Sequence, residues 1–437
     1  MNPRKPNQNF TIYLHVIIAI ALLPAYTKLG ESFKYLAAPY VFYLVWSEKP
    51  QYYPALIIQM ATGSTISLMV LLLCLIKTVL NYKKLKQITG SWLIWLAFLP
   101  APYMFYLTFI RYFEMDLGLI GSFVPLAYYL SLFPFFYGIL LSRNFNDFIF
   151  KAMIISLFLL FFISRFGILG LIRINTFSIV LLLVIGLITI MPFKISFHID
   201  KVTKYLGLFT IISFFMTSSG EKFHITLSVL LAFGVLYLYL RRNKFLLNNL
   251  VKPRIFIVLA VVAILIINST YNYKGATDAS DFSYNKIEDF PSYIMFKALG
   301  DRGPIWYGVW HSVLDEKIYF PPLKVVGIDY LAVSGGLVED SDIPAHNIVL
   351  ELLRNYGLIF GFLFSGIYIL MIIKFANVFR LKNQNPYVLL LSSVVFGIAI
   401  VVGMTGQFVL MPDFSLLLMG MAGICMGYSY HRQNSII

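Results

Sequence analysis

The sequence predicts an all-α membrane protein, a polytopic transmembrane helical bundle of about 12 helices with one large periplasmic loop. Only 12% of its 437 residues are charged, against about 25% in a soluble domain. The mean hydropathy is +0.80. Apolar runs of about 20 residues, the length that crosses a bilayer, recur along the chain. The net charge of +14 comes from basic loops between these runs, so no nucleic-acid partner is expected.

Each apolar run is interpreted as one helix, and the first run, which no small-residue cleavage site follows, as a retained helix. Thirteen runs are found. One of the first three is expected not to span fully, because the alternation of crossings fails before residue 80. The expected helices cover residues 10–27, 32–46, 54–80, 92–110, 117–141, 149–169, 173–193, 205–217, 223–240, 255–269, 347–373, 386–410 and 414–430.

Clusters of Lys and Arg in short loops predict which loops face the cytoplasm. The clusters are Lys83, Lys84 and Lys86, then Arg241, Arg242, Lys244, Lys252 and Arg254, then Lys374, Arg380 and Lys382. With alternating crossings, the turns at 111–116, 165–173 and 217–222 then lie on the periplasmic side, together with the long segment 270–346.

The large periplasmic loop, residues 270–346, separates N-terminal transmembrane helices at 1–269 from C-terminal transmembrane helices at 347–437. A surface helix is expected near 303–318, where Pro304 fits a first turn. Apolar side chains follow at a spacing of 3, 4, 7 and 8, namely Trp306, Val309, Trp310, Val313 and Leu314. We expect this helix to lie in the membrane surface, with its Trp side chains at headgroup level.

His346 and Asn347 open the apolar helix that follows the loop. Ser341 or Asp342 can cap its first turn and Pro344 fits inside that turn, so the helix dipole disfavours a second proton on the imidazole. A neutral His346 can act as a general base, and Asn347 can hydrogen-bond a hydroxyl-rich ligand. An interfacial histidine that only contacts lipid headgroups fits the same position.

Glu351 and Arg354 are spaced three residues apart and can pair on one face of the same helix. Arg354 lies about 12 Å along the helix axis from His346. Ionisable side chains at that depth tend to face a polar cavity. A pair that merely neutralises itself between packed helices is an equally good interpretation.

Further cations are expected at the outer ends of helices, where Lys and Arg are usually scarce. They are Arg302, Arg165, Arg173 and Lys222. Together they could converge on a diphosphate, although lipid headgroups are the alternative ligand. Arg302 precedes the surface helix, and its guanidinium can bind two phosphate oxygens at once. No metal site is predicted, because the acidic run 339–342 is typical of a solvated loop, and Cys74 and Cys425 fall in apolar runs.

The helix opened by His346 carries a pattern that resembles the O-antigen ligase and polymerase superfamily of bacterial membrane proteins. Near the end of the large periplasmic loop that family has His-Asn/Ser/Gln, nine residues, then Gly-x-x-Gly/Thr/Tyr. This chain reads His346-Asn347, nine residues, Gly357-Leu358-Ile359-Phe360, then Gly361. Phe360 stands where the family has a small residue or Tyr.

A second stretch, Asp301 to Trp306, resembles the Arg-x-x-x-Trp segment that opens the same loop region in the family, and Val326-Gly327-Ile328 matches the turn that follows. The family's Ser-Arg pair is matched poorly. The stretch TSSGEK has Gly220 where the Arg is expected and Lys222 two places later. The match covers about residues 300 to 430.

The resemblance implies an inverting, metal-independent glycosyltransferase that needs no cofactor. His346 would act on the acceptor, while cations, Arg302 first among them, hold the diphosphate of an undecaprenyl-diphosphate-linked oligosaccharide donor. The expected substrate-binding residues are Asn347, Lys222, Arg165, Arg173, Arg354 and Glu351.

We therefore expect a repeat-unit polymerase of O-antigen or capsular polysaccharide, multi-pass in the bacterial inner membrane, with its active site facing the periplasm. The alternative is an O-antigen ligase that moves the glycan onto lipid A-core, and transfer onto protein is a third possibility. Expected partners are the lipid-linked donor, a glycan or lipid A-core acceptor, membrane lipids and a chain-length regulator. A transporter for the same lipid-linked sugars is the alternative from another class, but it would show repeated halves and charges at mid-membrane.

Overall fold

The computed structural model describes ten stretches of the chain and a few isolated residues near 205 and 231–235. The stretches are residues 8–28, 34–59, 64–114, 118–165, 302–322, 328–329, 339–340, 347–380, 385–405 and 412–434. They are almost entirely helical, which confirms the all-α class. The exception is an antiparallel pair of two-residue strands, β1 (Ile328–Asp329) and β2 (Glu339–Asp340). The helices predicted at 173–193, 205–217, 223–240 and 255–269 lie outside the described stretches.

Three helical stretches among the described residues are long and apolar enough to cross a membrane: Ser91–Phe113, Pro125–Asn144 and Ile348–Arg380. A fourth is possible if Ile66–Leu80 and Tyr82–Thr89, which meet at 87°, form one broken span. The chain is thus a helical membrane protein. The total of about 12 spans stays a prediction.

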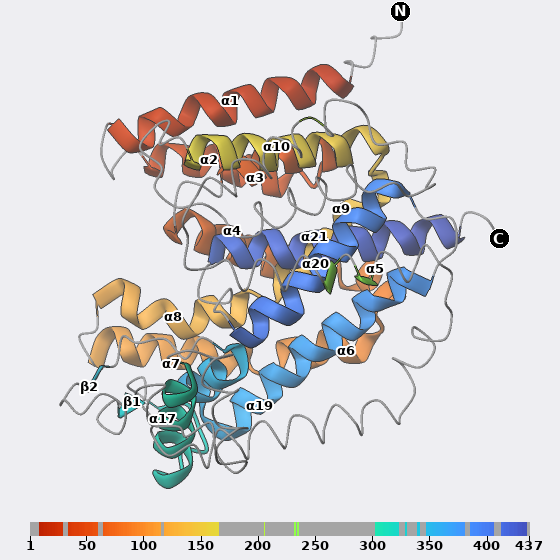
Figure 1. The fold of residues 1–437 in the computed structure, drawn as a ribbon. Coiled ribbons are helices and arrows are strands. Elements are labelled where there is room, and N and C mark those ends of the chain that lie inside the picture. The colour runs from red at the N-terminus through yellow and green to blue at the C-terminus, as the bar shows by residue number, and fades with distance from the viewer. Residues whose placement is uncertain are drawn as a thin grey trace, which may run out of the picture.

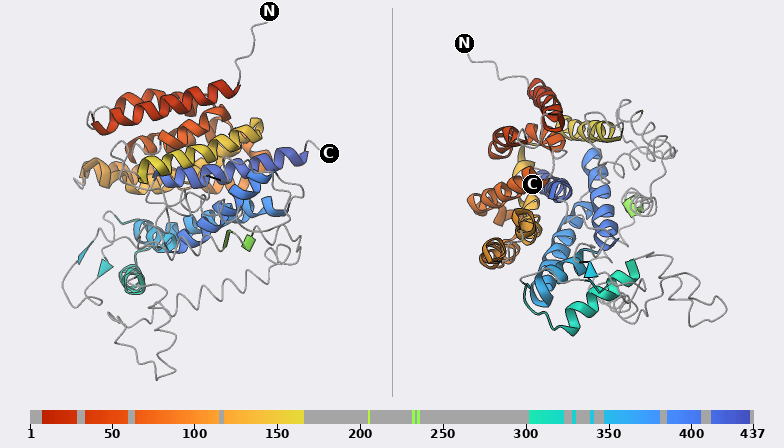
Figure 2. Two further views of the ribbon diagram at one scale, coloured as in Figure 1. Left: turned by 45° about the horizontal axis from the view of Figure 1, so that its top comes forward. Right: turned by 90° about the vertical axis from the view of Figure 1, so that its left-hand side faces the viewer.

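The helices form layers in which α9 and α21 lie at the centre (Figure 1). The N-terminal helices are α1 Gln8–Lys28, α2 Lys34–Trp46, η2 Pro50–Tyr52, α3 Tyr53–Gln59, α4 Ser64–Leu80, α5 Tyr82–Thr89, α6 Ser91–Phe98, α7 Ala101–Glu114, α8 Gly118–Leu130, α9 Phe133–Leu141, η4 Ser142–Asn144 and α10 Asp147–Arg165. The later helices are α17 Arg302–Asp315, α19 Ile348–Ala376, η7 Asn377–Arg380, α20 Pro386–Thr405 and α21 Pro412–Asn434. Figure 2 shows α17 and the strand pair at one end of the bundle and the C-terminus at the other.

Two of the predicted helices are divided in the structure. The run 92–110 was expected as one helix, but a turn at residues 99–100 divides it into α6 and α7. For the run 54–80 the structure describes α3, whose seven residues are all buried, and α4, while residues 60–63 between them lie outside the described stretches. The run 117–141 divides into α8 and α9. Pro134 lies in the first turn of α9, where its missing N–H costs nothing, and it disfavours a continuous helix before it.

The centre of the bundle depends on the close approach of α9 and α21. A Cβ atom on Gly138 of α9 would overlap the backbone of Gly420 in α21, and one on Gly423 would overlap the carbonyl of Phe135. Small residues at such crossings let two membrane helices approach until their backbones touch. This contact therefore fixes the two central helices against each other.

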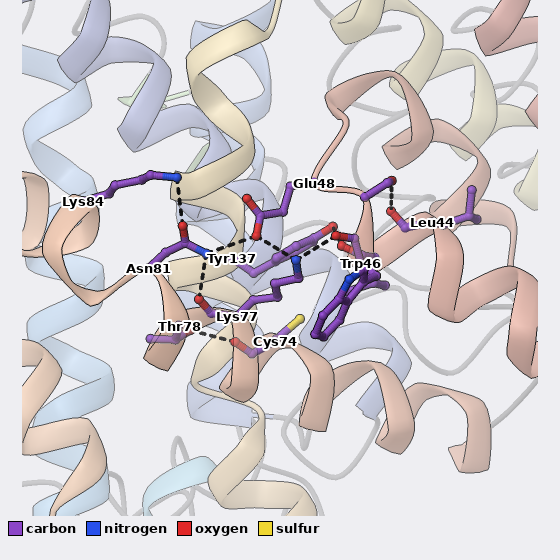
Figure 3. Close-up of polar contacts among 11 residues, drawn as sticks. Leu44, Trp46, Glu48, Cys74, Lys77, Thr78, Asn81, Lys84 and Tyr137 are labelled. Carbon is purple, nitrogen blue, oxygen red and sulfur yellow. Dashed lines mark hydrogen bonds and ion pairs between the residues drawn. The ribbon is translucent and has the colours of Figure 1, made fainter.

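A polar network ties the end of α4 to the turn after α2 (Figure 3). The Lys77 ammonium lies 2.9 Å from a Glu48 carboxylate oxygen and donates to the Trp46 carbonyl at 2.7 Å. It also lies 4.2 Å from the centroid of the Trp46 ring. Asn81 donates to the same Glu48 oxygen at 3.0 Å. Because Lys77 is only 8% exposed, these partners replace most of its water.

Two of the three basic stretches predicted to be cytoplasmic, at α5 and at the end of α19, lie together at this end of the bundle, and the third, 241–254, lies outside the described residues. The Lys374 ammonium donates to the Thr89 carbonyl at the end of α5, and the Tyr430 hydroxyl donates to the Gln87 carbonyl at 3.2 Å. Helix α5 exposes Lys83, Lys84 and Lys86 on its basic face. The alternation of crossings fits this grouping, while the side of the membrane stays a prediction.

Candidate functional site

Helix α17 begins at Arg302, close to where the sequence predicts a surface helix, but it packs differently from the prediction. Its apolar face, Trp306, Val309, Trp310 and Val313, forms one cluster with Leu350 and Leu353 of α19. Trp306 is 4% exposed and Trp310 6%, so both indoles pack against protein rather than lipid, while their depth in the membrane stays a prediction. The first turns of α19 are themselves apolar on this side, and they cover the face that was assigned to lipid.

Asn347 caps α19, so the prediction that Ser341 or Asp342 caps it is wrong. The Asn347 side-chain oxygen accepts from the backbone N–H of Val349 at 2.9 Å and of Leu350 at 3.2 Å. These are two of the four N–H groups that a helix start leaves without an intrahelical partner. His346 directly precedes this cap in the sequence and lies outside the described residues.

Helix α19 bends at Gly357, which has φ 71° and ψ −178°. The N–H groups of Leu358 and Ile359, which the bend removes from the helix ladder, donate to the carbonyls of Ile318 and Tyr319 at 2.9 and 3.0 Å. The 318–322 segment, which directly follows α17, therefore completes the hydrogen bonding of a bent membrane helix.

Both glycines of the His-Asn…Gly motif are required by this bend. A Cβ atom on Gly357 would lie 2.6 Å from the Phe320 carbonyl oxygen, and one on Gly361 would lie 2.7 Å from the Leu353 Cα. Such distances leave no room for a side chain. The ring of Phe360, the position that departs from the family pattern, stacks on Tyr103 of α7 at 5.2 Å and 8°. Thus the large side chain joins α19 to α7.

The predicted Glu351–Arg354 pair is confirmed. Arg354 Nη1 lies 3.9 Å from Glu351 Oε2, with both residues on the first half of α19 and buried. Asn355 also donates to Glu351 Oε1 and to its backbone carbonyl, each at 2.9 Å. The carboxylate is thus held by two side chains of its own helix at the level of the bend.

Arg111, near the end of α7, is a site residue that the sequence analysis missed. Its side chain is fully buried, and its Nη2 donates to the Pro322 carbonyl at 2.6 Å. Its Nε and Nη1 find no hydrogen-bond partner within the described part of the chain. Arg111 could have been found from its position in a turn predicted to lie on the periplasmic side, where basic residues are scarce. The same criterion singled out Arg165 and Arg173.

Tyr356 connects Arg111 to the Glu351–Arg354 pair. It interacts with Arg111, its hydroxyl donates to the Pro125 carbonyl of α8, and its ring meets the Tyr128 ring edge-on at 6.4 Å. Tyr128 in turn interacts electrostatically with Glu351. The described residues of this cluster carry two buried guanidinium groups and one buried carboxylate, so the cluster has a net positive charge.

The remaining predicted site residues are placed only in part. Arg302 is the first residue of α17 and Arg165 the last of α10, but their side chains lie outside the described residues, as do Arg173 and Lys222 altogether. Helix α10 lies in a different layer from α17 (Figures 1 and 2). Within the described stretches, no group of three or more His, Cys, Asp or Glu side chains could hold a metal ion.

The fold and the site together define a helical membrane protein with a buried cationic cluster at the end of the bundle where α17 packs on α19. No protein-family model matches the chain, and no curated protein matches it either. The resemblance therefore rests on the motifs alone.

Proposed function

We propose that this chain is a membrane glycosyltransferase that polymerises undecaprenyl-diphosphate-linked repeat units into O-antigen or capsular polysaccharide. The observation that carries the proposal is the packing of α17 on the first half of α19. It joins the two stretches that resemble the family, one opened by Arg302 and the other by His346-Asn347, into one unit.

The buried cluster supplies the charge that such a reaction needs. In the transfer, an acceptor hydroxyl attacks the anomeric carbon, its proton passes to neutral His346, and the bond to the diphosphate oxygen breaks. Negative charge builds on the departing diphosphate, and fixed guanidinium groups stabilise it. The reaction proceeds with inversion and without a metal ion, so chelation by EDTA should leave turnover unchanged.

Glycan length on a gel tests the proposal. Cells that lack the protein should carry lipid A-core with a single repeat unit, and the intact protein should restore the ladder. The variant His346→Ala should not restore it, whereas the control His431→Ala, in the last turn of α21, should. A ladder fully restored by His346→Ala would refute the assignment of the general base.

The same gel separates the alternatives. Bare lipid A-core, with long glycan remaining on undecaprenyl diphosphate, would indicate the ligase instead. A transporter would retain most of its function in His346→Ala, because no proton transfer limits it.

A further inference from the structure

An apolar groove of about 480 Å³ lies between α4, α7 and α8. Four phenylalanine side chains, Phe105, Phe109 and Phe113 of α7 and Phe123 of α8, and four leucine side chains make up most of its wall. The hydroxyl of Thr108, one of the few polar atoms in the wall, is already bound to the Met104 carbonyl of its own helix at 2.8 Å. The groove therefore offers almost no hydrogen bonds and fits a hydrocarbon chain.

The groove is open along α7, where Phe109 is 62% and Phe113 66% exposed. The helical stretch that carries these side chains, Ser91–Phe113, is one of those able to cross a membrane. Lipid therefore has direct access to the groove.

Arg111 lies on α7 beside the groove, although its side chain is not part of the groove wall. It follows groove-lining Thr108 by one helical turn and directly precedes groove-lining Tyr112. Leaving guanidinium donors buried and unpaired is costly, and Nε and Nη1 have no hydrogen-bond partner among the described residues. A phosphate oxygen is the acceptor that a guanidinium binds most favourably.

We propose that this groove holds the polyprenyl chain of the lipid-linked donor and that Arg111 binds the diphosphate of the same donor. This inference rests on the proposed function. The occupant is the donor and not a bulk phospholipid, because Arg111 is fully buried and connects through Tyr356 and Tyr128 to Glu351. A headgroup site for bulk lipid would instead be built from exposed basic side chains. Arg111 is thus a binding residue on α7, separate from the two stretches that resemble the family.

Binding of undecaprenyl diphosphate to the purified full chain in nanodiscs tests this placement without any turnover. Arg111→Gln removes charge-assisted hydrogen bonds and should weaken binding by about tenfold or more, while Arg111→Lys should recover part of the loss. Leu72→Trp narrows the groove from α4 and should also weaken binding, whereas the matched control Leu80→Trp, 63% exposed on the same helix and outside the groove, should bind as wild type.

Two outcomes would overturn the placement. One is wild-type affinity in both Arg111→Gln and Leu72→Trp, and the other is equal competition by phosphatidylglycerol, which would mean a site for bulk lipid. His346→Ala should bind the donor as wild type does. If the gel shows no polymerase activity but undecaprenyl diphosphate still binds in an Arg111-dependent way, the proposed function is refuted and the lipid site is not.

Discussion

Replacing Gly357 by Ala should destabilise the protein more than any other single methyl group added to α19. At φ 71° and ψ −178° the backbone lies in a region that is essentially restricted to glycine, and an L side chain there costs about 1–3 kcal/mol. The new Cβ would also lie 2.6 Å from the Phe320 carbonyl oxygen and 2.9 Å from its nitrogen, so the 318–322 segment must move.

That movement breaks the bonds from Leu358 and Ile359 to the carbonyls of Ile318 and Tyr319. Each N–H group of a membrane helix left without a partner adds about 1–3 kcal/mol, so the whole substitution should cost about 3 kcal/mol or more. The total stability of a typical domain is about 5–15 kcal/mol, so a loss of this size is large.

Thermal unfolding of the purified protein in detergent, followed by size-exclusion chromatography, measures the effect. The matched control is Gly366→Ala on the same helix, where nothing lies within 4 Å of the added Cβ. Because Ala is the better helix former by about 1 kcal/mol, that variant should keep or raise the unfolding midpoint. If Gly357→Ala shifts the midpoint no further down than Gly366→Ala, the bend does not require a glycine and the reasoning fails.

Two further predictions concern side chains at opposite ends of the bundle. Lys77→Met should cost about 1–3 kcal/mol, because a partly buried carboxylate loses its cation, whereas exposed Lys86→Met should change the unfolding midpoint little. Asn347→Ala removes both capping bonds and should cost about 1 kcal/mol, while Asn347→Asp caps equally well and should keep the midpoint. If Asn347 also binds substrate through its amide N–H₂ group, Asn347→Asp should fail to restore the glycan ladder although its stability is unchanged. If the ladder is unaffected, Asn347 acts only as a helix cap.

The positions of the helices could be predicted from the sequence because apolar length is a strong signal in a membrane protein. Their interruptions could not. An apolar run reads the same whether it forms one helix or two, so the division of the run 92–110 into α6 and α7 was not predicted. The bend at Gly357 was visible only as a motif glycine, since its φ value depends on the distant Phe320 backbone.

Contacts in the candidate site could be predicted from the sequence where both partners lie on the same helix. Glu351 and Arg354 pair at the expected spacing, because helix geometry alone brings them together. The role of Arg111 depends on Pro322, more than two hundred residues away in sequence, and no local pattern contains that contact. Likewise the apolar face around Trp310 fits lipid or protein equally well in the sequence, and only the folded chain distinguishes the two.

The contact between α19 and the 318–322 segment has a consequence for how this chain tolerates change. The segment takes part through the carbonyl oxygens of Ile318 and Tyr319 and through that of Pro322, which Arg111 binds. Every amino acid supplies such an oxygen, so these three hydrogen bonds constrain the number of residues in the segment more than their identity. Inserting or deleting one residue between Asp315 and Ile318 would shift all three acceptors out of register at once. This stretch should therefore accept many substitutions and almost no change of length.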